Sequence, residues 1–551
     1  MSLSDSKTMN KGGDFLVHEP EIYFIPEEFQ QDEKLMAETA YQFCKREVLP
    51  IVERLENFED GLMPSLVKKA CELGFGGLDT PEKYGGLGLS KTLSIRILEM
   101  LSLNGSFSTT IGVQQGIGQT PLVLFGNEEQ KKKYLPLITS GEWMTAYALS
   151  EPNSGSDALS ISTKAILKDS HYHLEGTKMW ISNAKWANLF ITFAKIDGDK
   201  FSCFLVERDF PGVSISREEH KMGLKGSSTA RLILEDAKVP DVNLLYKAGE
   251  GHRVAFNGLN IGRCKLAGMA LGQCRESIHQ AVKYAKERKQ FNQPISNFGL
   301  IKDKLSRMGA FMFAAESILY RTAVLLDEAF STVNYDSENL PEENRRASEE
   351  FQIECSIVKV FATDVLGYCV DESLQIHGGY GFTEEFPVAR MYRDARVMRI
   401  YEGTNEINRL FIFDRVIRKG LDTLVNKELT VASNYISQLA PFAVKAMEDK
   451  ARYDSQQITG ALSDLIITHY AIHSSQLRAQ KMKNMNHPQA GFAQSCADFY
   501  TSVAASYAHM KAAEVSQRLG VPVTIPEWNG GYASDADIAD ALLESGGYPL
   551  T

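Results

Sequence analysis

Apolar residues between positions 28 and 144 recur at spacings of three and four, the period of an amphipathic helix. The stretch EEFQQDEKLMAETAYQFCKREVLPIVERLE shows this spacing, and NEEQKKKYLPLITSG predicts a helix that stops at Gly141. We therefore expect a helical domain over residues 28–144. Residues 1–27 are expected to form a mobile leader, with an apolar patch (Ile22–Ile25) that can dock on the body.

The pattern changes near residue 145. Short runs rich in β-branched and aromatic residues, broken by Gly, Asp and Asn, replace the helical spacing. These runs are HYHLEGTKMWISN, LFITFAKI, FSCFLVE and ARLILEDAKV. They predict an antiparallel β domain over residues 145–251.

Helical spacing returns at residue 252. A polar stretch at 330–346 is interpreted as a loop within a helical bundle that spans residues 252–419. Residues 420–551 then form an additional helical domain. The chain is thus predicted to have an α+β fold, in the order helical domain, β domain, helical bundle and extra C-terminal helical domain.

Composition and charge narrow the class of protein. The net charge is -11 and the sequence pI is near 5.6, so there is no overall basic field to attract nucleic acid or anionic lipid. The 8 cysteines are scattered singly, which argues against structural zinc and against a disulfide framework. The N-terminus lacks the apolar core of a secretory signal, and no long apolar run is present. We expect a soluble, cytoplasmic protein with no metal and no nucleic-acid partner.

Glu402 lies in the stretch RIYEGTNEI, between an apolar run and the predicted start of a helix at Thr404. A carboxylate held in such a position can be a catalytic base. It can equally be an acid that stabilises the start of the helix. The stretch by itself leaves both interpretations open.

Two stretches of the predicted β domain suit a planar cofactor. YALSEPNSGSDA (147–158) is a loop whose backbone N–H groups and hydroxyls can face an anion or a polar ring. EGTKMWISNA (175–184) places Trp180 and Ser182 two residues apart on a strand, and hence on one face. The alternatives are a plain turn and a core tryptophan beside a satisfied serine.

Two further stretches lie in the predicted bundle. ERKQF (287–291) sets Arg288 and Gln290 at a helix end, where they suit a pyrophosphate or form an ordinary solvated end. In QIHGGYGF, Gly378 and Gly379 allow the backbone to approach a ligand closely. The same segment runs on to Glu402.

Together and in this order, these motifs resemble the acyl-CoA dehydrogenase family, flavoproteins built from a helical domain, a β domain and a helical bundle. The resemblance covers about residues 30–420. The stretches LNIGR (259–263) and NFGLIKDKLSRM (297–308), with the extra segment after residue 420, are closest to the very-long-chain acyl-CoA dehydrogenase branch.

The resemblance implies roles for individual residues. Glu402 matches the catalytic base. A minority of members carry the base just before the residue that matches Arg263, and here that position is Gly262, which cannot act as a base. The residues that match FAD contacts are Tyr147, Leu149, Ser150, Gly155, Ser156, Trp180, Ile181, Ser182, Arg288, Gln290, Phe291, Gln375, Ile376, Gly378, Gly379, Thr404 and Glu406. The residues that match substrate contacts are Ser156, Asn260, Arg263, Tyr401, Gly403 and Gly112.

Three positions bear on how the substrate and the flavin are held. Ser182 stands where the family more often has Thr, so the hydroxyl is kept on a less constrained side chain. Asn260 stands where medium-chain members have Asp. A predicted helix at 108–122 matches the one that floors the acyl cavity. The missing side chain of Gly112 would let an acyl tail run deeper, or would simply allow close helix packing.

The activity that the resemblance implies is FAD-dependent dehydrogenation of a long-chain fatty acyl-CoA to trans-2-enoyl-CoA in β-oxidation, with electrons passed to an electron-transferring flavoprotein. A homodimer is expected, with the extra domain folded onto the catalytic bodies and no membrane contact. The alternatives are an acyl-CoA oxidase that uses oxygen and a non-catalytic relative with a binding or assembly role. Residues 420–551 carry nine Lys and Arg against thirteen Asp and Glu, the wrong sign for DNA binding.

Overall fold

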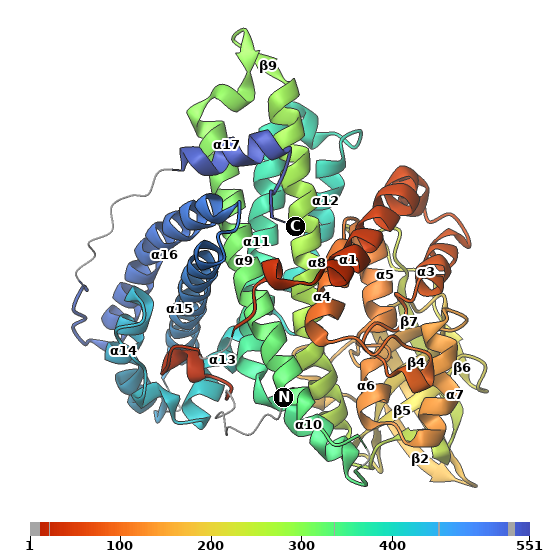
Figure 1. Ribbon diagram of the computed structural model, residues 1–551. Helices are drawn as coiled ribbons and strands as arrows, with labels where there is room; N and C mark the ends of the chain where they lie inside the picture. Colours follow the sequence, from red (N-terminus) through yellow and green to blue (C-terminus); the bar gives the residue numbers. More distant parts are fainter. Residues whose placement is uncertain (1–10, 21–22, 336, 450–451, 527–534, 551) are drawn as a thin grey trace, which may run out of the picture.

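The helical spacing of the N-terminal part produces helices as expected (Figure 1). The computed structural model describes residues 11–20, 23–335, 337–449, 452–526 and 535–550. The helices of this part are α1 (Gln31–Phe43), α2 (Val52–Glu56), α3 (Leu62–Glu72), α4 (Lys91–Met100), α5 (Gly105–Gln115), α6 (Thr120–Phe125) and α7 (Glu128–Thr139). The predicted stop after α7 is confirmed, since Gly141 adopts φ 72° just past the helix end.

The expectation of one helix over residues 108–122 is wrong. Helix α5 ends at Gln115 and α6 begins at Thr120. Gly118 lies between them, and a Cβ atom there would stand 2.2 Å from Oγ1 of Thr145. The spacing of apolar residues runs on across this break, so periodicity alone does not reveal it.

Residues 144–245 form an eight-stranded sheet in the order β6-β7-β3-β2-β4-β5-β8, with β1 also beside β4. The strands are β1 (Met144–Ala148), β2 (Lys164–Lys168), β3 (His171–Ser182), β4 (Ala187–Ile196), β5 (Lys200–Glu207), β6 (Val213–Ile215), β7 (Thr229–Pro240) and β8 (Leu244–Leu245). The pairing is antiparallel as predicted, except that β1 and β2 run parallel to β4. Residue patterns within single strands carry no information on that direction.

Strand β4 joins the sheet to the helices. Leu189, Ile191 and Phe193 belong to the large core that the helical parts share. Phe190 and Ala194 belong to a separate core within the β domain. Alternate side chains of β4 therefore point into two different cores. Because both faces of the strand are buried, its sequence is a nearly continuous apolar run.

The bundle surrounds the long helix α8. Its elements are α8 (Gly251–Glu287), β9 (Lys289–Gln290), β10 (Gln293–Pro294), α9 (Gly299–Ser331), α10 (Leu340–Glu350), α11 (Gln352–His377), α12 (Pro387–Ala395) and α13 (Asn405–Arg418). Most of α8 is buried, as expected for a helix packed on several sides. Within the described residues, α9 alone is long and apolar enough to cross a membrane, but 89% of that window is buried in the fold. It is a core helix of this bundle.

The loop predicted at 330–346 is shorter than expected. Helix α9 ends at Ser331, and α10 already begins at Leu340 with Pro341 in its first turn. Proline is well placed there because the first N–H groups of a helix need no intrahelical partner. Helix α10 was not predicted because its sequence is polar and contains a proline.

The C-terminal part packs beside the bundle and then returns to it (Figure 1). Its helices are α14 (Val431–Met447), α15 (Ser455–Asn484), α16 (Ala490–Leu519) and α17 (Ala536–Ser545). A Cβ atom on Gly309 of α9 would meet Ile538 and Leu542 of α17 at 3.1 Å, so the two helices are in close contact. Arg275 of α8 donates to the carbonyl of Leu550 at 2.6 Å. Residues 420–551 are thus tied to the bundle at several points.

The described part of the predicted leader is docked rather than mobile. Phe15 is buried and lies 4.5 Å, ring centroid to centroid, from Tyr470 of α15. The N–H of Gly13 donates to the carboxylate of Glu354 at 2.6 Å. Ile25 is also buried, whereas Ile22 lies outside the described residues. The segment was predicted mobile because its polar composition hides these long-range contacts.

Candidate active site

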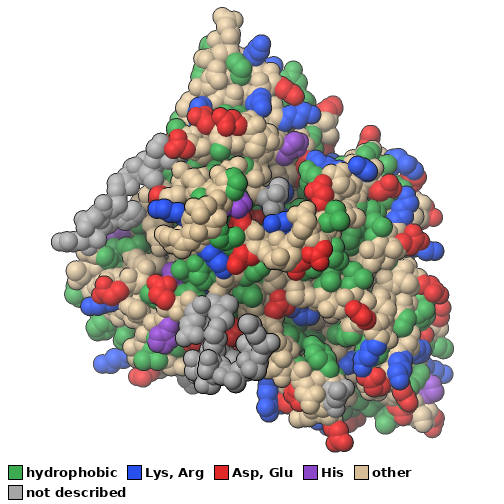
Figure 2. All heavy atoms as spheres, in the orientation of Figure 1, with side chains coloured by type: hydrophobic (Ala, Val, Ile, Leu, Met, Phe, Trp, Pro, Cys, Tyr) green, Lys and Arg blue, Asp and Glu red, His purple; other side chains and the backbone are tan. Residues whose placement is uncertain are grey.

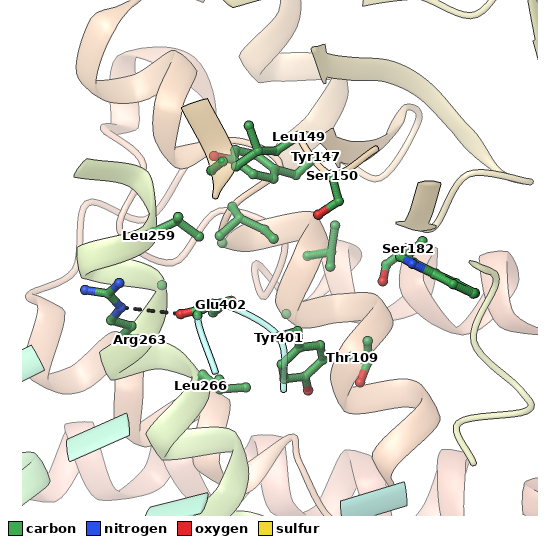
Figure 3. Close-up of a pocket in the computed structure, with 18 of the residues that line it drawn as sticks. Thr109, Tyr147, Leu149, Ser150, Ser182, Leu259, Arg263, Leu266, Tyr401 and Glu402 are labelled. Carbon is green, nitrogen blue, oxygen red and sulfur yellow. Dashed lines mark hydrogen bonds between the residues drawn. The ribbon is translucent and has the colours of Figure 1, made fainter. Parts of the chain in front are cut away.

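A cavity of 230 Å³ lies where α5, the β domain and α8 meet (Figure 3). Many residues singled out in the sequence line it: Tyr147, Leu149, Ser150, Gly155, Ser156, Trp180, Ile181, Ser182, Arg263, Tyr401, Glu402, Gly403 and Gly112. Figure 3 shows Tyr147, Leu149 and Ser150 across the cavity from Glu402 and Tyr401. Segments far apart in the chain therefore converge on one site.

Glu402 sits on a short, strained loop before α13. Its backbone adopts φ 55°, which costs a non-glycine residue about 1–3 kcal/mol. The loop is held because the carbonyl of Gly403 accepts from Nζ of Lys359 and from Nδ2 of Asn408, both at 2.8 Å. Thr404 is the N-cap of α13, as predicted, and its hydroxyl accepts from the N–H of Ile407.

The surroundings of Glu402 suit a base. Burial raises its pKa to about 7, against the opposing effect of the nearby cations Lys359 and Arg263. The contact of Arg263 is with the backbone: its Nε donates to the carbonyl of Glu402 at 3.5 Å (Figure 3). Oε2 of Glu402 has no hydrogen-bond partner among the described residues. A carboxylate oxygen is thus free to take a proton at near-neutral pH.

Gly262 has a second role beyond being unable to act as a base. A Cβ atom at this position would lie 3.0 Å from Oε2 of Glu402 and 3.0 Å from the side chain of Ile117. The missing side chain therefore leaves the space that the Glu402 carboxylate uses.

Trp180, near the end of β3, lines the cavity with its indole ring. Trp180 adopts φ 62°, and the register with β7 shifts between Lys178 and Ile181. Trp180 and Ser182 do both line the cavity, but simple strand alternation does not bring them there, which corrects the prediction. The indole remains 57% exposed, so it has a free face for a planar ligand.

The Ser- and Gly-rich loop at 147–158 is more than a plain turn. Buried Glu151 accepts from the N–H of Thr163 at 3.1 Å and from Nζ of Lys178 at 2.7 Å. Burial opposes ionisation, but Lys178 outweighs it and lowers the pKa of Glu151 to about 2. The N–H of Met179 donates to the carbonyl of Ser150, which joins the loop to β3. Ser150 and its neighbours are therefore held in place.

A second group of predicted residues lies at another pocket. Arg288, Gln290, Ile376, Gly378 and Gly379 line it. Beside it, Phe291 is 86% exposed in the β9–β10 turn, and Gln375 is exposed on α11. Neither of these two lines the pocket.

The two sites stand well apart. Arg263 and Arg288 are separated by roughly 37 Å along α8, at 1.5 Å rise per residue. The Arg263 side of the cavity is therefore far from the second pocket within a single chain.

Besides Phe291 and Gln375, three more predicted residues lie outside both linings. Oδ1 of Asn260 accepts from Nη1 of Arg263 at 3.2 Å, so Asn260 orients Arg263. Thr404 caps α13, and Glu406 is exposed in the first turn of that helix. Their contacts with CoA or flavin remain predictions.

Comparisons with known proteins bear on this arrangement. Residues 30–142, 146–237 and 249–417 match the acyl-CoA dehydrogenase N-terminal, middle and C-terminal domains. A probable acyl-CoA dehydrogenase of Bacillus subtilis is 48% identical over 419 residues, which are 75% of this chain and 70% of that protein. The chain belongs to the acyl-CoA dehydrogenase family.

Two more relatives extend the comparison within the acyl-CoA dehydrogenase family. The human mitochondrial very long-chain specific acyl-CoA dehydrogenase is 37% identical over 398 residues, 69% of this chain and 58% of that protein. A crystal structure of an acyl-CoA dehydrogenase complexed with FAD from Bacillus anthracis matches with a TM-score of 0.93 and 40% identity, over 98% of this chain and 100% of that one. The extra C-terminal helices are thus shared with the Bacillus anthracis structure.

Acyl-CoA dehydrogenases are FAD-dependent oxidoreductases that act on CH–CH groups, and the cavity fits that cofactor. The exposed indole of Trp180 offers a flat surface, and the hydroxyls of Ser150 and Ser182 line the same space. A Cβ atom on Gly155 would meet nothing within 4 Å, so the loop backbone there is open to a ligand.

The structure adds residues of this acyl-CoA dehydrogenase that the sequence motifs missed. Met269 lines the cavity and lies over Gly112, and Lys359 supports the Glu402 loop. The signal for Lys359 was a single lysine within the apolar run QIECSIVKVFATDVLG. Met269 had no signal, because one more apolar residue on a buried helix is unremarkable.

Proposed function

We propose that this protein dehydrogenates a long, straight-chain fatty acyl-CoA to the trans-2-enoyl-CoA in fatty acid β-oxidation, with FAD in the cavity. The observation that carries the proposal is the carboxylate of Glu402. It faces an apolar cavity, it has an oxygen without a hydrogen-bond partner among the described residues, and its pKa is near 7.

The reaction needs a base at carbon 2 of the acyl thioester. That carbon is far too weakly acidic for a carboxylate in water, so binding must acidify it by stabilising the enolate oxygen. The raised pKa of Glu402 makes it a stronger base than an exposed glutamate. The strained loop and Lys359 hold it in one place, which favours alignment with the substrate. The flavin that Trp180 and Ser182 would hold would supply the hydride acceptor for carbon 3.

The two separate clusters support a homodimer that shares its flavins. The residues at Trp180 and Ser182 suit the ring system, whereas Arg288 and Gly378–Gly379 suit the pyrophosphate and adenosine. Since roughly 37 Å of α8 separates Arg263 from Arg288, the second cluster would serve the flavin of a partner subunit.

The apolar character of the cavity supports a fatty acyl chain as substrate. Ile117, Leu266 and Met269 are among the apolar residues that line it. Very-long-chain relatives support a long chain, although this chain spans only 58% of the length of the human one.

The electron acceptor and the cellular site complete the proposal. We assign electron transfer to an electron-transferring flavoprotein and a cytoplasmic location, both by family resemblance and composition. Acidic and basic side chains are interspersed over the face in Figure 2, and such a mixed face is not suited to binding a membrane surface.

Anaerobic titration of the purified flavoprotein with acyl-CoAs of graded chain length tests the proposal. We expect the flavin absorbance to bleach, most rapidly with long straight chains. Absence of bleaching with every acyl-CoA would contradict the activity. Stoichiometric peroxide during aerobic turnover would instead identify an oxidase.

A further inference from the structure

A network of hydrogen bonds between buried and half-buried polar groups connects the described part of residues 420–551 to the loop that carries Glu402. On α15, Oδ1 of Asp464 accepts from Nε of Arg409 at 2.7 Å. Nη2 of Arg409, on α13, donates to Oδ2 of Asp364 on α11 at 2.9 Å. One arginine thus joins a carboxylate of the extra domain to a carboxylate of the bundle.

The network continues from Asp364 to the loop that carries Glu402. Oδ1 of Asp364 accepts from Nδ2 of Asn405 at 2.9 Å. Oδ1 of Asn405 accepts from Nζ of Lys359 at 2.8 Å, and the same Nζ donates to the carbonyl of Gly403 at 2.8 Å. Lys359 and Asn405 are fully or almost fully buried. Hydrogen bonds in such surroundings are strong, and losing one partner leaves the other unsatisfied.

We infer that the extra C-terminal domain is a positioning element for catalysis: through Arg409, Asp464 fixes Asp364, Asn405 and Lys359, and so fixes the loop that aims Glu402. This inference rests on the proposed function. It assigns a role in the reaction to Asp464, a residue outside the substrate cavity and outside the three matched domains.

The contacts around Asp464 support a fixed geometry. Its other oxygen lies 3.2 Å from Nζ of Lys511 on α16, and its side chain is 10% exposed. Ser463, the preceding residue, donates to the backbone carbonyl of Arg409. Arg409 is therefore held at its guanidinium and at its backbone by consecutive residues of α15.

The charged and titratable groups around Glu402 predict how breaking this hydrogen-bond network would change the ionisation of Glu402. Lys359 of α11 and Arg263 of α8 favour its ionised form, whereas Tyr401 and Tyr147 carry no charge at neutral pH. If Lys359 loses its partner Asn405, its stabilisation of the Glu402 carboxylate weakens. The pH at which the base ionises then rises.

The test compares Asp464→Asn with Asp454→Asn. Asp454 is also a buried aspartate of the extra domain, paired with Arg452 at 2.7 Å, but it has no link to the loop among the interactions of the described residues. We expect Asp464→Asn to slow anaerobic flavin reduction by about 10- to 100-fold, with little change in acyl-CoA KM, because a small misplacement of a catalytic group costs this much. Its pH profile should move to higher pH, and Asp454→Asn should leave both unchanged.

Two further measurements keep the test decisive. Hydrogen exchange should be faster at the amides of residues 402–408 in Asp464→Asn than in Asp454→Asn, whatever the flavin does. If Asp464→Asn does not fold, Asp364→Asn must reproduce the slower reduction and the shifted profile; Asp364 is the more exposed partner of Arg409, at 38%.

Equal rates, equal pH profiles and equal exchange in the two variants would overturn the inference and leave Asp464 a purely structural residue. Failure of the wild-type protein to bleach with any acyl-CoA would instead overturn the proposed function. In that case, the hydrogen-exchange comparison of the two variants would still test whether Asp464 holds the loop at residues 402–408.

Discussion

Sδ of Met269 lies 2.7 Å from the point where a Cβ atom on Gly112 would stand. The space left by the missing side chain of α5 is thus already occupied by a side chain of α8. Of the two interpretations of Gly112, close helix packing therefore fits this contact, and Met269 is the side chain that we expect to limit how far an acyl tail can run.

Replacing Met269 by Ala should shift the substrate preference to longer acyl-CoAs. The shorter side chain uncovers Gly112, and each additional buried CH₂ group gains about 0.8 kcal/mol. The free protein should lose about 2–5 kcal/mol of stability from the new cavity. The ratio of kcat/KM values across a chain-length series measures the shift. An unchanged chain-length profile would place the end of the cavity elsewhere.

Replacing Gly112 by Leu should instead destabilise the fold, because the added side chain would overpack the space that Met269 fills.

Replacing Glu402 by Gln removes the proton acceptor and keeps the size of the side chain. Flavin content should stay normal, while the rate of anaerobic reduction by substrate should fall by roughly 10²–10⁴-fold. Stopped-flow absorbance measures this rate. Near-normal reduction in the variant would mean that another group is the base.

The pKa of Glu402 also predicts two pH effects of known sign. Because the base must be ionised, flavin reduction should speed up as pH rises through about 7. The folded pKa is raised above the ordinary value of 4.5, so the stability from this group is present below that value and is lost as pH rises through about 7. Thermal melts should therefore show Glu402→Gln gaining stability relative to wild type between pH 5 and pH 8. A constant difference would contradict the raised pKa.

Replacing Arg288 by Ala should lower FAD retention and weaken the dimer together, because a shared cofactor stabilises the assembled state. Lys289→Ala is the matched control, since Lys289 is the next cation and does not line the second pocket. Flavin absorbance after gel filtration and sedimentation velocity measure the two effects. A variant that loses FAD and keeps a full-strength dimer would exclude sharing across the interface.

The intact chain should have the mass of two subunits in multi-angle light scattering. Helices α14–α16 pack beside the bundle, where they are expected to cover the surface that a second dimer would need (Figure 1). A tetramer at the same protein concentration would rule out this capping role.

Several features could be predicted from the sequence because they depend on neighbours along the chain. The cap at Thr404, the stop at Gly141 and the change from helical to strand spacing near residue 145 are local patterns, and each is confirmed. Glu402 could be singled out because an acid between an apolar run and a helix start is unusual, and the ordered motifs then identified the family.

Other features depend on where distant segments meet, and only the tertiary structure decides them. The left-handed backbone at Trp180, the docking of Phe15 on α15 and the filling of the Gly112 space by Met269 are examples. The raised pKa of Glu402 is another, since it arises from burial. The sequence by itself determined the order of the domains, the family and the residue proposed to take the proton. The packing of α8, α11 and α15 decided how that residue is held, because burial and hydrogen bonding between remote groups exist only after the chain has folded.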